Sequence, residues 1–154
     1  MEYSWIYESP IGNLTLIVND THLLKICFNE SGLNTMVKET ELIKKTKREL
    51  DEYFAGKRTV FTIPLDPRGT EFQKQVWSEL LNIPYGQTIS YKELAEKVKN
   101  AKYSRAVGMS NNKNPIPIII PCHRVIGSQG KLVGYRGGLN IKEKLINLEN
   151  NAIM

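Results

Sequence analysis

This 154-residue chain lacks a hydrophobic run long enough to span a bilayer, and its opening residues lack the pattern of a secretory signal. The sequence MEYSWIYESP has neither a basic segment nor an apolar stretch behind it. A membrane helix needs about 20 consecutive apolar residues, and no later segment approaches that length. We therefore expect a cytoplasmic protein without a membrane partner. It has enough residues for one core or for two small lobes, since domains typically hold about 100–150 residues.

Cysteine and histidine are scarce, with 2 of each in the chain. Cys27 and Cys122 lie far apart in a chain expected in the cytoplasm, which argues against a structural disulfide. Only His22 and His123 could join them on a zinc ion, and no paired ligand spacing such as CxxC occurs. We predict no metal site and no cofactor, and we expect Cys27 to be a buried strand residue.

The positive charge is unevenly distributed. Residues 1–66 hold 8 basic and 10 acidic side chains, a net charge of −2, whereas residues 67–154 hold 13 and 6, a net charge of +7. A concentrated positive field suits a polyanionic partner such as nucleic acid, because neutralised phosphates release their counterions. An ordinary solvated basic surface would have the same charges, so charge alone leaves both interpretations open.

The first third of the chain has the pattern of a small antiparallel sheet. Three short segments, SWIYE, LTLIVN and LLKICFN, are separated by turn signals at PIGN and at ND. A helix is predicted over residues 41–55, with Gly56 as its C-terminal stop. VFTIPLDPRG then predicts one more strand and a proline-containing linker, so we place a lobe boundary after Asp66.

Helices with clear start signals dominate the later part of the chain. Thr70 with Gln73, and Ser90 with Glu93, have the spacing of capping boxes, and a third helix is predicted from Ser104. The last two of these helices, joined by a short connection, form a helix-turn-helix candidate. VIGSQGKLVG predicts a hairpin that would form a wing beside them.

The predicted fold class is therefore α/β, of the α+β kind. Residues 1–66 would form a small antiparallel-sheet lobe with one main helix. Residues 67–154 would form a mostly helical, winged helix-turn-helix lobe, which closes with a helix from Asn140.

Cys122 follows three consecutive isoleucines, which predicts a thiol at the end of a buried segment. A thiol is a strong nucleophile only as the thiolate, and a free cysteine, with a pKa of about 8.5, is mostly protonated at neutral pH. We expect His123 to take the proton and the sulfur to be held as the anion. Adjacent residues of extended backbone point to opposite sides, so this requires either a turn at Pro121 or a bridging water. A carboxylate could orient the imidazole, and spacing alone does not say which one.

Five segments together resemble the O6-alkylguanine-DNA alkyltransferases, also called methylated-DNA–protein-cysteine methyltransferases. They are RGTEFQKQVW (68–77), IPYGQTISYKELA (83–95), SRAVGMSNNKNPIPIIIPCHRVI (104–126), GYRGG (134–138) and KEKLINLE (142–149). The resemblance is dense from Arg68 to Glu149 and loose in the first lobe, for which it implies an RNase H-like fold. It implies single-use DNA repair by a monomer acting on double-stranded DNA that contains O6-alkylguanine, with O4-methylthymine as a further candidate substrate.

The resemblance also implies the roles of five residues. Cys122 would take the alkyl group, His123 would act as base through a water, and Glu149 would orient the histidine. Asn114 would brace the active-site turn. Tyr91 would crowd the backbone phosphate during base flipping and hydrogen-bond the guanine.

DNA contacts and the substrate pocket are implied in the same way. Arg105 would fill the stack that the flipped base vacates. The small residues that would let this helix enter the minor groove are Ala106, Gly108 and Ser110. The residues that would form the pocket are Pro117, Val125, Tyr135, Arg136 and Gly137. Arg136 stands where some relatives have serine, which bears on the width available to bulky O6-benzyl groups.

Two other functions remain open on the residues alone. A winged-helix protein could sense alkylated bases without transferring anything, although relatives of that kind lack the reactive cysteine. A thiol hydrolase could use Cys122, His123 and Glu149, which would leave Arg105 and the basic second lobe without a purpose.

Overall fold

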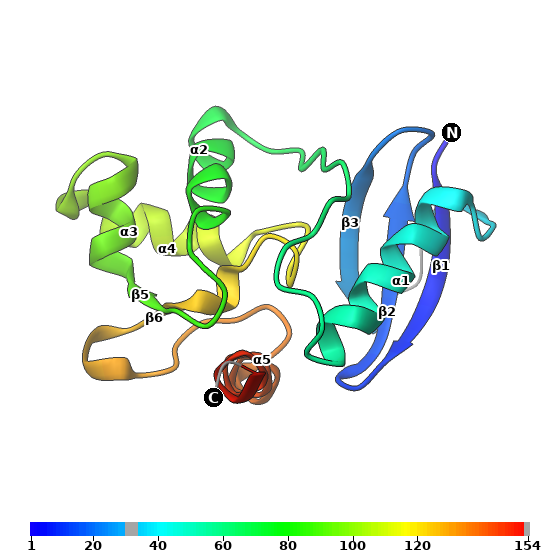
Figure 1. The fold of residues 1–154 in the computed structure, drawn as a ribbon. Helices are drawn as coiled ribbons and strands as arrows, with labels where there is room; N and C mark the ends of the chain where they lie inside the picture. Colours follow the sequence, from blue (N-terminus) through cyan, green and yellow to red (C-terminus); the bar gives the residue numbers. More distant parts are fainter. Residues whose placement is uncertain (30–33, 153–154) are drawn as a thin grey trace. The chain divides into compact units, whose positions relative to one another are not determined.

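The computed structural model describes residues 1–29 and 34–152. Its backbone contacts divide the chain into two compact units, Met1–Arg68 and Gly69–Met154, whereas the sequence pattern places the boundary after Asp66. The first unit is built on a sheet and the second is mostly helical (Figure 1). Within these described ranges, no helix is both long and apolar enough to cross a membrane.

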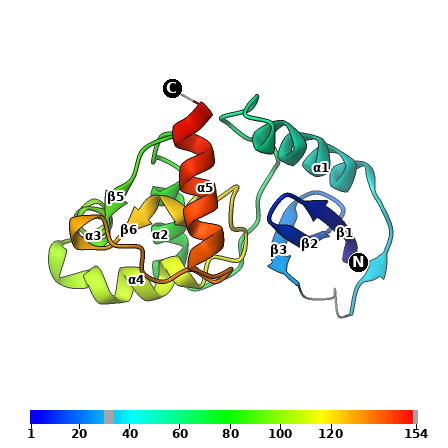
Figure 2. The ribbon, with the colours of Figure 1, turned by 90° about the horizontal axis from the view of Figure 1, so that it is seen from below.

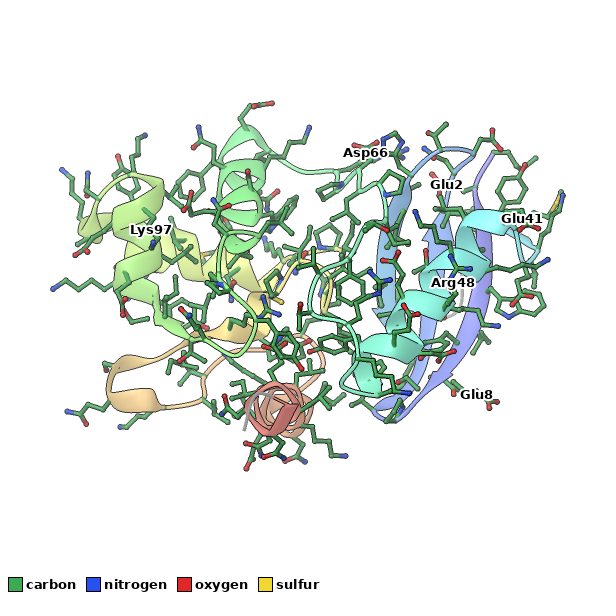
Figure 3. The ribbon with its side chains drawn as sticks, in the orientation of Figure 1. Glu2, Glu8, Glu41, Arg48, Asp66 and Lys97 are labelled. Carbon is green, nitrogen blue, oxygen red and sulfur yellow. The ribbon has the colours of Figure 1, made fainter. Side chains whose placement is uncertain are left out.

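A four-stranded sheet forms the first unit. Its strands are β1 (Tyr3–Ser9), β2 (Gly12–Val18), β3 (Leu23–Phe28) and β4 (Met36–Val37), in the order β3-β2-β1-β4. The first three form the expected antiparallel meander, with Tyr3 opposite Val18. The short β4, which the sequence pattern did not predict, pairs in parallel with β1. Cys27 lies in β3 as expected but is only half-buried. Glu2 directly precedes β1, and Glu8 lies near the other end of the strand (Figure 3).

One helix, α1 (Glu41–Phe54), covers a face of this sheet (Figure 1). The Thr40 hydroxyl caps it by accepting a hydrogen bond from the Ile43 amide at 3.2 Å. Gly56, at φ +73°, ends it in the left-handed conformation that glycine adopts most easily. Ile43 and Leu50 are fully buried against the sheet, so the predicted helix and its stop signal are confirmed.

The segment after α1 does not form the expected strand. Leu65 makes a single bridge to Leu23 of β3. The neighbouring prolines have no amide hydrogen to donate to a sheet ladder, which prevents a continuous strand. Side chains hold the segment instead. The buried Glu49 carboxylate accepts hydrogen bonds from the amide of Thr62, at 2.8 Å, and from its hydroxyl, and it lies 3.7 Å from the Arg58 guanidinium.

Helices make up most of the second unit. They are α2 (Glu71–Leu80), α3 (Tyr91–Val98), α4 (Ser104–Asn112) and α5 (Leu139–Ala152), with short 3-10 turns η1 (Ala101–Tyr103), η2 (Cys122–Arg124) and η3 (Ser128–Gly130). Both predicted capping boxes are present, at Thr70 with Gln73 and at Ser90 with Glu93. The helices α3 and α4 pack against each other across η1, as expected for the helix-turn-helix.

The expected hairpin wing is wrong in its pairing. The strand β6 (Val125–Ile126) pairs in parallel with β5 (Ile89–Ser90). The next turn closes through a hydrogen bond from the Gly127 amide to the Lys131 carbonyl at 2.7 Å. Residues 131–135 form no strand, because β6 is only two residues long and pairs with β5 rather than with the returning chain.

The core of the second unit joins helices that are distant in sequence. Trp77 on α2 is buried and donates its indole N–H to the Ser110 carbonyl on α4 at 2.8 Å. The last helix, α5, begins one residue before the expected Asn140 and lies beside η2 (Figure 2). Lys97 of α3 is exposed to solvent and lines a shallow cleft with Glu71 and Lys74 of α2 (Figure 3).

Replacing Thr70 with Ala removes the side-chain acceptor of the Gln73 amide, which lies 3.1 Å away. Loss of such a cap should lower the free energy of unfolding by about 1 kcal/mol, measured by urea denaturation. Ser78→Ala, at an exposed position of the same helix, is the matched control and should change stability by less than about 0.5 kcal/mol. Equal stability of the two variants would show that the capping box contributes nothing.

Candidate active site around Cys122

Cys122 stands at the end of a buried and tightly braced loop. Asn114 accepts a hydrogen bond from the Ile116 amide at 3.0 Å and donates one to the Ile120 carbonyl at 2.7 Å. The Cys122 amide donates to the same carbonyl at 2.8 Å across Pro121, whose φ of −81° and ψ of 64° are those of an inverse γ-turn. The chain therefore makes a turn at Pro121, one of the two alternatives left open by the sequence, but His123 Nδ1 makes no hydrogen bond to the sulfur.

Backbone strain is stored in the same loop. Ile118 has a φ of +75°, in the left-handed region that a β-branched residue rarely occupies. Such a conformation costs on the order of 1–3 kcal/mol. The Ile118 side chain is buried, so its packing and the bracing by Asn114 offset this cost.

His123 shares a buried carboxylate with its neighbour Arg124. His123 Nε2 lies 2.6 Å from Glu149 Oε2, while Arg124 Nε and Nη2 lie 2.8 and 3.1 Å from the two Glu149 oxygens. All three side chains are buried. Glu149 reaches the pair from α5, the helix that lies beside η2 (Figure 2). The fold thus brings a carboxylate from a distant helix onto the imidazole.

The protonation states of this cluster follow from its contacts. Burial alone would raise the pKa of Glu149, but the hydrogen bonds and charges of His123 and Arg124 outweigh it and lower the pKa to about 2. Burial lowers the pKa of His123, so the imidazole is neutral at pH 7. A carboxylate can only accept, which puts the imidazole proton on Nε2. Nδ1 then keeps a lone pair, and it has no partner within the part of the chain that the structure describes.

The IPYG turn before β5 completes the surroundings of the carboxylate. Arg124 Nη1 donates to the Ile83 carbonyl at 2.7 Å, and the Gly86 amide lies 3.3 Å from Glu149 Oε1. The guanidinium also lies 5.7 Å from the centre of the Tyr85 ring. A buried ion pair stabilises a fold only when its remaining donors and acceptors are satisfied, and this turn supplies those partners.

The Cys122 thiol is protonated at neutral pH. Burial raises its pKa to about 11, although a hydrogen bond from Asn114 and the charges of Lys142 and Arg136 act in the opposite direction. The expectation of a resting thiolate is therefore wrong, because removing water from a charged sulfur outweighs the nearby donors. A base must take the proton when a reaction begins.

Tyr91 reaches the site from the start of α3, directly after the strand that pairs with β6. Its hydroxyl donates to the Val133 carbonyl at 2.9 Å. Burial, and then the nearby Cys122, raise the pKa of this phenol, so it remains a donor at neutral pH. Lys142 Nζ donates to the same Val133 carbonyl at 2.8 Å and to the Gly134 carbonyl at 3.2 Å.

An open groove of about 510 Å³ lies beside Tyr91. The residues that line it are Tyr91, Ser104, Arg105, Gly108, Met109, Asn112, Val133 and Gly134. Cys122 is not among them and is only 5% exposed. Tyr91 therefore belongs to both the groove and the surroundings of the thiol, and its hydroxyl bonds to the Val133 carbonyl in the groove wall.

The residues expected to meet DNA do not all lie on the accessible side of α4. Arg105 and Ala106 are exposed and Gly108 is half-buried. Ser110 is buried, and its carbonyl accepts the Trp77 indole N–H. At 3.6 residues per turn, Ser110 lies about 140° around the helix from Arg105. The expectation for Ser110 does not fit the structure, because its position faces the core.

The expected pocket residues differ in exposure. Pro117, Val125 and Tyr135 are buried, Gly137 is half-buried and Arg136 is exposed. Burial, and then the nearby Cys122, raise the pKa of Tyr135. The charge of Arg136 acts to lower the pKa of Cys122. Tyr135 and Arg136 therefore both lie within electrostatic reach of the thiol.

Sequence reasoning assigned no role to Arg124 or Lys142. Arg124 stands inside the PCHRV motif, where a cation next to the proposed base was visible. On α5, Lys142, Leu145 and Glu149 have the spacing i, i+3 and i+7, which puts all three on one helix face. All three are buried. The signal available in the sequence was the position of Lys142 and Glu149 on the same helix face as Leu145, an apolar residue expected in the core.

Each of the two units matches a domain of one known protein family. Residues 3–67 match the ribonuclease-like domain of 6-O-methylguanine DNA methyltransferase, and residues 71–151 match the DNA binding domain of the same protein family.

Individual relatives match over almost their whole length. A methylated-DNA–protein-cysteine methyltransferase of Methanosarcina acetivorans is 47% identical over 155 residues, covering 97% of this chain and 99% of the relative. One of Mycobacterium leprae is 45% identical over 152 residues, covering 96% and 92%. The crystal structure of Mycobacterium tuberculosis OGT in complex with DNA matches with a TM-score of 0.90 at 43% identity, covering 98% of this chain and 93% of that one.

Glu149→Gln should make the free energy of unfolding less dependent on pH in the acid range. The pKa of Glu149 is about 2 in the fold and 4.5 ordinarily, so its ionised form stabilises the fold fully above pH 4.5. That contribution is lost as the pH falls through 2, and it amounts to about 3 kcal/mol at about 1.4 kcal/mol per pKa unit. Urea denaturation of both proteins between pH 6 and pH 2.5 measures it. A stability difference that stays constant over this range would contradict an ionised, paired Glu149.

Proposed function

Because this chain belongs to the 6-O-methylguanine DNA methyltransferase family, we propose that it repairs DNA by transferring the alkyl group of O6-alkylguanine irreversibly to Cys122. The observation that carries the proposal is the buried row of a thiol, a neutral imidazole and an ionised carboxylate. His123 donates from Nε2 to Glu149, which leaves Nδ1 as the only basic nitrogen of the ring. This is the arrangement of a nucleophile, a base and an orienting group.

Proton transfer begins the reaction. The Cys122 proton passes to His123 Nδ1 through a bridging water, because a buried nitrogen without a protein partner is commonly paired by water. Glu149 and Arg124 hold the ring in the tautomer that can accept the proton. The imidazolium that forms is stabilised by the ionised carboxylate 2.6 Å away.

Alkyl transfer follows in one displacement. The Cys122 sulfur forms a bond to the alkyl carbon as the bond from that carbon to O6 breaks. The electron pair of the broken bond stays on the guanine, which takes up the proton that Cys122 gave to His123 and is restored. A thioether has no easy return step, so each molecule acts once.

The groove beside α4 is the proposed approach for the damaged nucleotide. The O6 atom is inside the duplex, so the nucleotide must be extruded, at a cost of a few kcal/mol. Arg105, exposed at the start of α4, would fill the vacated stack, and Ala106 and Gly108 would let the helix approach the minor groove. The extruded base would pass Tyr91 to reach the sulfur. Tyr91 would then hydrogen-bond it.

The remaining groups fit the same proposal. Asn114 would hold the turn that presents the thiol. Pro117, Val125 and Tyr135 would form the walls around the base, and a backbone amide of the loop containing Arg136 and Gly137 would lie near O6. We propose that the protein acts as a monomer, because every proposed reacting group comes from one chain. We also propose double-stranded DNA as its partner and the cytoplasm as its location. O4-methylthymine is a second candidate substrate.

A defined duplex with one O6-methylguanine should add the mass of one methyl group to the Cys122 peptide. The Cys27 peptide of the same digest should stay unmodified, since that cysteine lies in the first unit. Mass spectrometry after reaction at equal concentrations measures both. Restored guanine alongside an unmodified Cys122 peptide would exclude the proposed transfer.

Cys122→Ser completes this test. The variant should lose all transfer and keep its affinity for DNA within about threefold, because the thiol is buried and does not line the groove. A large loss of affinity would make the thiol a structural residue. An acyl-enzyme formed with a simple ester would favour the hydrolase alternative.

Arg105→Ala should slow transfer from duplex DNA by about tenfold or more, because the cost of extrusion is then no longer offset. Transfer from the same lesion in a single strand should change little. Lys102→Ala, another exposed basic residue just before α4, is the charge-matched control. If Arg105→Ala slowed transfer from both substrates equally, or if both variants slowed transfer from the duplex equally, a role of Arg105 in base extrusion would be contradicted. Attraction of the DNA phosphates would then explain the loss of rate.

A further inference from the structure

A buried amide on α4, that of Asn111, has no role in the reaction described above. The Asn111 side chain is 1% exposed, and its Oδ1 atom has no hydrogen-bond partner among residues 1–29 and 34–152. Buried polar atoms in folded proteins are nearly always paired, because an unpaired acceptor loses its contact with water and gains nothing in return. An unpaired amide oxygen this close to the thiol loop requires an explanation.

The nitrogen of the same amide is engaged by two acceptors. Asn111 Nδ2 donates to the Cys122 carbonyl at 3.4 Å. Burial raises the pKa of Tyr91, and a hydrogen bond from Asn111 acts to lower it, so the amide also donates to the phenol oxygen. The Tyr91 hydroxyl donates its own hydrogen to Val133, which leaves its oxygen free to accept. These contacts fix the orientation of the amide, because a carbonyl accepts and never donates.

The amide lies between the groove and the thiol. Gly108, three residues before Asn111 on α4, lines the groove, and a β-carbon placed on it would lie 3.5 Å from the Tyr91 ring. Residues three apart share a helix face, and from this face Asn111 reaches the backbone of Cys122. A base that passes Tyr91 to reach the sulfur therefore comes to lie beside the Asn111 amide.

An alkylated guanine has a single group that can donate to this oxygen. The alkyl group on O6 leaves N1 without a proton, and N9 is bonded to the sugar. N3 and N7 are acceptors, so the exocyclic amine on C2 is the remaining hydrogen-bond donor of the base. An acceptor that is buried and unpaired beside the base is complementary to that amine.

We propose that Asn111 recognises the extruded O6-alkylguanine, with Oδ1 accepting a hydrogen bond from the exocyclic amine on C2. This inference rests on the proposed function and adds a specificity residue to it. Buried acceptors are commonly paired by water in a resting protein, and the amine would take the place of that water. A site of this kind rejects bases that lack the amine, because the oxygen is then left unpaired.

O6-methylhypoxanthine tests the proposal, because it differs from O6-methylguanine only in lacking the amine. Each base is placed at the same position of one single-stranded oligonucleotide, so that base pairing does not affect the comparison. Methylation of the Cys122 peptide is followed by mass spectrometry at equal, subsaturating oligonucleotide concentrations. The wild-type protein should react about tenfold faster or more with O6-methylguanine. Equal rates on the two bases would overturn the proposal.

Asn111→Leu removes the amide and keeps a side chain of similar size. The ratio of the two rates should fall from about ten or more to between about one and three. Loss of the contacts of Nδ2 affects both substrates alike, so the ratio isolates the amine. Asn147→Leu makes the same change at an exposed position of α5 and should keep the wild-type ratio.

An unchanged ratio in the Asn111→Leu protein would contradict recognition of the amine, however much both rates fall. If this variant fails to fold by circular dichroism, Asn111→Ala takes its place. The wild-type ratio then still decides, because a value near one overturns the proposal without any variant.

Alkylation without DNA separates base recognition from an effect on the thiol. Iodoacetamide at pH 7 should modify Cys122 of the Asn111→Leu protein within about threefold of the wild-type rate. A fall as large as the fall in transfer from O6-methylguanine would assign the amide to the thiol instead of the base. Wild-type transfer that does not depend on the amine would overturn this inference and leave the proposed function intact. No transfer from either oligonucleotide would overturn both.

Discussion

The buried Glu149 carboxylate is the group on which the rest of the site depends. It connects α5 to η2, accepts from His123 and Arg124, and receives the Gly86 amide of the IPYG turn. An ionised carboxylate is stable at such depth only when each of its oxygens is paired. The contacts that lower its pKa also set the tautomer of the imidazole, so the fold and the proposed base are determined by one cluster.

Burial keeps the Cys122 thiol protonated at neutral pH, so its proton must be removed when it reacts. A thiol with a pKa of about 11 carries almost no thiolate at neutral pH. The neutral His123, held by the Glu149 carboxylate, is the adjacent base that can take up this proton. Burial therefore raises the pKa of the thiol, and the charges of Lys142 and Arg136 offset only part of that rise.

Local signals in the sequence predicted the helices more accurately than the strands. The caps at Thr70 and Ser90 are correct because capping depends on residues three positions apart. The strand in VFTIPLDPRG and the hairpin wing are wrong because strand pairing depends on partners that local patterns do not name. The short β5–β6 pair is an example, since Ile89 and Val125 are far apart in the chain.

The sequence by itself determined the identity of the reactive segment, the caps of the helices and the uneven charge, since each is written in neighbouring residues. Only the tertiary structure decided that the thiol rests protonated, that Ser110 faces the core and that Lys142 lies under the groove wall. The reason is physical. A pKa depends on the water excluded and the charges gathered around a group, and these come from segments that only folding brings together.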